Sequence, residues 1–302
     1  MTGMHCRASR IVIRGNRSIF DCLAPGSVAV RRVPAIASTP DGRARLSRPA
    51  WSPSKSPVEG VIVDREPRFL KVPEAELQGV ARTSLDSPAP TLAQLDRKRR
   101  SIAIIEALGL PWLETLPVVE DESKIVPRAR DEVAARCVAT EICAVKGETN
   151  DNHMTQLVAK LFAARSFFSA AERAFFDNPA PSQRDRARFA WRYECAHVFL
   201  WSLGYLPELH PPDAIANVPR EAAIFADKGP QHFAPDAKLR PLHELLDQAD
   251  LYYRLHWAVI QLRLKGASSP NADEEIIMER HRALNWLIRY MGQSWDNVTT
   301  DT

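Results

Sequence analysis

Arginine, histidine and glutamate side chains recur along the second half of the chain and are its best candidates for chemistry. Glu194 and His197 stand three residues apart in RYECAH, a spacing that places both side chains on one face of a helix. The same stretch begins with an arginine, and two further Arg–His groups follow near the C-terminus. The candidate ligand-binding residues are therefore Arg192, Glu194, His197, Arg254, His256, Arg280 and His281.

Glu-x-x-His on a helix is also one of the two such motifs that carboxylate-bridged di-iron bundles use as ligands. Such a site needs a second copy of the motif and two further glutamates. The sequence holds no second copy, so we interpret Glu194 and His197 as a hydrogen-bonded core pair. We expect neither a metal site nor a cofactor.

No complete catalytic constellation is present. A catalytic histidine needs an orienting carboxylate and a cleft, and Glu279 is expected to point away from His281 on its helix. Neither a G-x-S-x-G motif nor a glycine-rich phosphate loop occurs. We therefore interpret His256 and His281 as core histidines and assign no catalytic residue.

The last sixty residues should position most of these side chains. Pro241 suits a first helical turn, Gly266 suits a helix end, and Asn271 suits the N-cap of a following helix. Apolar residues recur at helical spacing on both sides of this turn. The pattern predicts two antiparallel helices, about 241–266 and 273–291, with polar side chains between them.

Upstream, helical periodicity begins at the capping box Thr91–Gln94, and a second box follows at Ser169–Glu172. Met154, Leu157, Val158, Leu161 and Phe162 form one amphipathic stripe. The fold class is all-α, a compact multi-helix domain with a C-terminal antiparallel helix hairpin. The further helices are expected at about 91–109, 127–146, 152–165, 169–178 and 183–203. Between 205 and 239 we expect an irregular segment, of a length typical of functional loops, lids or covering segments.

Residues 1–90 differ from the rest in composition. They hold 14 Lys and Arg against 8 Asp and Glu, whereas residues 91–302 hold 26 against 29. Rich in Arg, Pro and Ser, the first part is expected to be a disordered basic leader, with one short strand at 61–72. Residues 91–302 should form the helical domain and fold without it.

The same composition limits the partners. The mildly acidic folded part argues against nucleic acid as its partner. No run of about 20 apolar residues occurs in the sequence, so no membrane span is predicted. The 5 cysteines include no C-x-x-C pair, which is typical of a reduced, cytoplasmic protein.

Buried charges must be paired. We therefore hypothesise that Arg192, Glu194, Arg254 and Arg280 meet in one ion network lining a pocket, with Glu141 and Asp250 as further carboxylates. We also expect Trp295, in the closing WDNVTTDT, to pack on the hairpin.

Several motifs resemble a known family. These are LPWLETLP, WRYECAHVFLWSLGY, DLYYRLHWA, ERHRALNWL and WDNVTTDT. Their order resembles the bacterial family called domain of unknown function 4272, over about residues 95–302. The resemblance supports the domain limits, and the family has no established activity to carry over.

The function expected first is binding, by a cytoplasmic helical module that takes a protein or a small ligand. The alternative is a hydrolase-type enzyme that uses the Arg/His/Glu cluster in a helical cleft. A deep cleft converging on Arg254, His256 and Glu194 would favour the enzyme, and an apolar surface patch would favour the binding module.

Overall fold

The computed structural model describes residues 89–302, and every regular element in that range is a helix. The all-α prediction is therefore confirmed for this part of the chain. The α-helices are α1 (Leu92–Ala107), α2 (Arg130–Thr149), α3 (Asn152–Leu161), α4 (Ala170–Asp177), α5 (Gln183–Ala190), α6 (Arg192–Ser202), α7 (Val218–His232), α8 (Leu242–Leu264) and α9 (Glu274–Leu287). Three short 3₁₀ helices accompany them, η3 (Glu122–Lys124), η4 (Ala164–Ser166) and η5 (Tyr290–Gly292).

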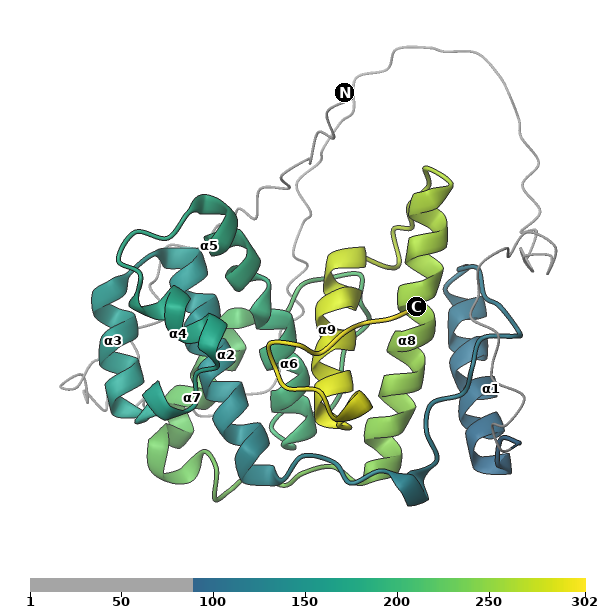
Figure 1. Cartoon of the computed structure of the whole chain (residues 1–302), viewed down its shortest axis with the longest axis horizontal. Coiled ribbons are helices and arrows are strands. Elements are labelled where there is room, and N and C mark those ends of the chain that lie inside the picture. Colours follow the sequence, from purple (N-terminus) through teal and green to yellow (C-terminus); the bar gives the residue numbers. More distant parts are fainter. Residues whose placement is uncertain (1–88) are drawn as a thin grey trace, which may run out of the picture.

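Six of these helices follow one another in space. Helix α1 packs on α8, α8 on α9, α9 on α6, α6 on α2, and α2 on α3 (Figure 1). Helices α8 and α9, which are neighbours in this row, form the predicted antiparallel hairpin. Because the row has two ends, α1 and α3 are each packed mainly from one side.

Local capping chemistry places most helix starts as predicted. Thr91 and Gln94 form a reciprocal capping box at α1, and Ser169 and Glu172 form another at α4. The N-cap of α9 differs from the prediction by two residues, because Asp273, and not Asn271, accepts the backbone N–H of Ile276. Such boundaries depend on which side chain reaches the free N–H groups of the first turn.

The helix predicted at 183–203 is divided in two. Helix α5 ends at Ala190 and α6 starts at Arg192, with Trp191 between them. The break lies next to a close crossing of α2 and α5. A Cβ atom at Gly147 would stand 2.6 Å from both the Ala190 nitrogen and the Arg186 oxygen, so only glycine fits this crossing.

The segment expected to be irregular at 205–239 contains a helix, which corrects that prediction. Asn217 caps α7 by accepting the N–H of Arg220, and Pro219 lies in the first turn, where a missing N–H costs nothing. Gly229, at φ +56°, interrupts the helix near its end. Two other helices are shorter than predicted, since α3 ends at Leu161 and α9 at Leu287.

The predictions for the leader and for a strand at 61–72 lie outside the described residues. Within residues 89–302, no helix combines the length and the apolar composition that crossing a bilayer requires.

The C-terminal tail packs on the helices, as expected for Trp295. Its ring is 5% exposed and lies 5.8 Å from the Trp286 ring of α9 and 5.7 Å from the Phe199 ring of α6. The indole N–H donates to Oε1 of Glu172 at 2.8 Å. The tail therefore joins the hairpin to α4 and α6.

We predict that Trp295→Ala lowers the free energy of unfolding by about 3–5 kcal/mol, the range for removing a buried aromatic ring. Chemical denaturation measures this directly. Met291→Ala, at a side chain that is 73% exposed on the same tail, is the matched control and should change little. An unchanged unfolding midpoint for Trp295→Ala would mean that the tail contributes nothing to stability.

Candidate functional site

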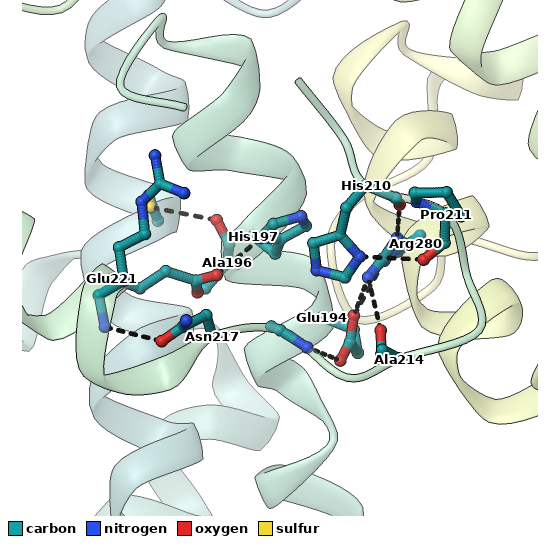
Figure 2. A network of polar contacts seen from close by, with 12 residues as sticks. Glu194, Ala196, His197, His210, Pro211, Ala214, Asn217, Glu221 and Arg280 are labelled. Atoms are coloured by element: carbon teal, nitrogen blue, oxygen red, sulfur yellow. Dashed lines mark hydrogen bonds and ion pairs between the residues drawn. The ribbon is translucent and has the colours of Figure 1, made fainter. Parts of the chain in front are cut away.

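Arg280 of α9 and Glu194 of α6 form a fully buried ion pair (Figure 2). Nε of Arg280 donates to Oε2 of Glu194 at 2.9 Å, and Nη2 lies 2.8 Å from the same oxygen. Nη1 donates to the Tyr252 hydroxyl at 2.9 Å and to the backbone carbonyl of His210 at 2.7 Å. Oε1 of Glu194 accepts the backbone N–H of Ala216 at 2.7 Å. The pair thus holds the segment between α6 and α7 against the hairpin.

His197 lies one turn beyond Glu194 and has a different partner. Its Nδ1 is 2.6 Å from Oε1 of Glu221, on α7, and the His210 ring packs against it at 4.6 Å between centroids. Burial, followed by the nearby Arg280 charge, lowers the pKa of His197 to about 3, and burial raises the pKa of Glu221 to about 8. Both shifts favour the uncharged forms, so we interpret the contact as a neutral hydrogen bond with one shared proton.

Glu141 of α2 is buried near this pair and takes no part in the hypothesised ion network. Within the described part of the chain, neither of its carboxyl oxygens has a hydrogen-bond partner. Burial, then the Glu221 and Glu148 carboxyls, raises the pKa of Glu141 well above its usual range. The physical consequence is a protonated, uncharged carboxyl in the core.

The remaining arginines of the hypothesised network belong to separate pairs. Arg254 binds Asp250 on its own helix through two bonds of 2.9 Å and donates to the Pro117 carbonyl at 2.8 Å. Arg192 donates to Oε2 of Glu279 at 2.5 Å. The structure thus distributes the buried charges among several pairs that each tie two segments together, and the single network is wrong.

Glu279 takes its partners from α6 and does not orient His281, as expected. It is 6% exposed, and the Cys195 thiol approaches its Oε2 at 3.1 Å. Burial raises the pKa of that thiol, which keeps it protonated and therefore a hydrogen-bond donor.

His256 and His281 meet across the hairpin. Their Nδ1 atoms are 3.1 Å apart and their rings are nearly perpendicular. Two nitrogens at this distance share one proton, so one neutral ring donates to the other. Burial lowers the pKa of His256 to about 4 and that of His281 to about 3, with each further lowered by a nearby basic group.

Of the seven candidate residues, the structure brings Glu194, His197 and Arg280 into one region and places the others elsewhere along the helix row. Sequence reasoning missed Glu221, because α7 was expected to be irregular. In residues 89–302 no three His, Cys, Asp or Glu side chains are arranged to hold a metal ion.

A second feature lies at the far end of the row. A hollow of about 500 Å³ opens beside α3, in the size range of small-ligand sites. Its floor includes Ala159, which is 1% exposed, while Leu157 at its edge is 46% exposed and the neighbouring Leu161 is 50% exposed. The lining residues are His153, Gln156, Leu157, Ala159, Lys160, Ala163 and Arg165.

Comparison with protein families identifies the class to which this helical domain belongs. Residues 97–298 match the family model described as "Domain of unknown function (DUF4272)", which covers more than half of the chain. The chain therefore belongs to this family, as its motifs indicated. Comparisons with curated proteins and with solved structures give no match.

We predict that Glu194→Gln destabilises the domain by about 2–4 kcal/mol, because it leaves the Arg280 charge buried without a counter-ion. The glutamine keeps an oxygen that accepts the Ala216 N–H, so the loss of stability measures the effect of removing the carboxylate charge. Thermal and denaturant unfolding measure it. Glu244→Gln, whose partner Arg240 lies near the surface, is the control and should cost less than about 1 kcal/mol.

The histidine pair predicts a dependence of stability on pH. Because the pKa values of His256 and His281 are lowered on folding, the unfolded chain binds more protons below about pH 6.5. The free energy of unfolding is therefore highest, as far as these two rings are concerned, above that pH. It decreases as the pH falls toward 4, by up to about 1.4 kcal/mol per pH unit for each ring.

Unfolding free energies measured between pH 7 and pH 4.5 test this expectation. The double variant His256→Gln with His281→Asn should show a shallower slope than the wild type. His232→Gln, at an exposed ring, should leave the slope as it is. Equal slopes for the double variant and the wild type would show that the buried pair does not drive the acid dependence.

Proposed function

We propose that this domain is a binding module and that its ligand lies on the exposed face of α3. The observation that carries the proposal is the position of the α3 stripe. Phe162 is buried and Val158 packs on the core, but Leu157 and Leu161 are about half exposed. The helix thus carries more apolar surface than its own domain covers, and such surface is typical of interaction sites.

The position of α3 supports this reading. It is an end helix of the row, packed chiefly on α2 and η4, so within residues 89–302 no further helix packs against its outer face (Figure 1). The hollow beside it supplies the concave shape that ligand sites share. The buried ion pairs of the core, in contrast, hold helices and loops together.

The rival hypothesis is a hydrolase centred on His197. One observation favours it: Glu221 orients Nδ1, and Nε2 is buried without a partner among the described residues, which is the arrangement of a general base. The ring is 3% exposed, however, so a substrate reaches it only if α7 or the preceding segment moves. Hydrolysis of small activated esters that is lost in His197→Gln would favour this enzyme over the binding module.

An anionic naphthalenesulfonate fluorophore tests the binding surface directly. We expect it to bind the native domain and to bind Leu157→Ser about tenfold more weakly, since an apolar contact worth roughly 1.4 kcal/mol is lost. Stability should change by less than about 0.5 kcal/mol, because the side chain is half exposed.

The matched control is Leu264→Ser, at a side chain that is 72% exposed near the end of α8. This variant should bind the fluorophore as the wild type does. Equal weakening by both substitutions would indicate general surface adsorption, and no effect of Leu157→Ser would place the ligand elsewhere.

A further inference from the structure

Two basic side chains, Lys160 and Arg165, line the α3 hollow together with His153, and none of the lining residues is acidic. Arg165 forms an ion pair with Asp177 but remains 58% exposed, so its guanidinium is available to a second anion. This basic rim lies on a domain that is mildly acidic over residues 91–302, and it therefore favours an anionic occupant.

The apolar surface extends beyond the hollow. Leu157 lines the hollow, but Leu161 does not, although it is equally exposed and stands one turn further along the helix, about 6 Å away. A small molecule that filled the hollow would leave Leu161 uncovered. The part of α3 from His153 to Leu161 is about 12 Å long, which matches two to three turns of a second helix laid alongside.

We propose that this surface, formed by Leu157, Leu161 and the basic rim, takes an amphipathic helix of a partner protein with acidic residues flanking its apolar stripe. The inference rests on the proposed binding function and names its partner. Leucines at i and i+4 of the partner pack on the α3 leucines and into the hollow, as in other helix-in-groove contacts. Its carboxylates face Lys160 and Arg165.

Two features favour a helix over a membrane surface. Only two leucines are strongly exposed on α3, and the hollow between α3 and η4 fits a protruding side chain and not a flat bilayer. The contact is small, so we expect an affinity on the order of micromolar, as in transient interfaces.

Synthetic peptides of 16 residues, held helical by a side-chain lactam, provide the test. One carries leucines at helical spacing with flanking glutamates, and its partner has every glutamate replaced by lysine. Fluorescence anisotropy should show binding of the acidic peptide and at least tenfold weaker binding of the basic one. Raising the salt concentration should weaken binding of the acidic peptide and should not weaken binding of the basic one.

Variants of the protein locate the contact. Lys160→Glu should weaken binding of the acidic peptide at least tenfold and strengthen binding of the basic peptide. Arg99→Glu, at a side chain that is 74% exposed on α1, is the charge control and should alter neither. Leu161→Ser should weaken binding of the acidic peptide but leave binding of the naphthalenesulfonate fluorophore unchanged, because Leu161 lies outside the hollow.

The outcomes separate the two proposals. Fluorophore binding that depends on Leu157, without peptide binding, overturns the helical partner and leaves the binding module standing. Equal affinity for both peptides also overturns it, because charge then plays no part. Binding to phosphatidylserine vesicles but not to the acidic peptide identifies a membrane surface in its place. Failure of fluorophore and peptide alike overturns both proposals.

Discussion

The Arg280 guanidinium is the interaction on which the centre of this domain depends. It is fully buried, and a buried cation is tolerated only where a counter-ion and hydrogen-bond acceptors surround it. The carboxylate of Glu194 supplies the counter-charge, Tyr252 supplies a hydroxyl, and carbonyls of the segment after α6 complete the shell. A segment with little regular structure is thereby fixed, and α7, which follows it, is placed where Glu221 meets His197.

The same constraint recurs where other charges are buried. Lys146 donates to the carbonyls of Phe176 and Asn178 at the end of α4, and Arg254 joins Asp250 to the carbonyl of Pro117. Each cation therefore ties a helix to a neighbouring loop, so these charges order connections that the apolar core cannot reach. Glu141 shows the other solution, since burial leaves it uncharged.

Local signals in the sequence were sufficient for the outline of the fold. The capping boxes at Thr91 and Ser169 and the turn after Gly266 are contained in a few residues each, so the helices and the hairpin could be predicted. The break at Trp191 could not, because it accompanies a crossing with α2. The pairing of the candidate residues was equally inaccessible: Glu221 and Glu279 are identified as partners only once distant helices pack.

The α3 stripe shows why a pattern alone does not distinguish core from interface. Its five apolar residues match one helical template, yet only part of the stripe is covered by the domain. At the opposite end of the row, exposed arginines of α1 pair with Asp96 and Asp247, as Arg165 pairs with Asp177 beside α3. At α3, uncovered leucines, a hollow and basic side chains lie together, and recognition of an acidic apolar partner requires all three.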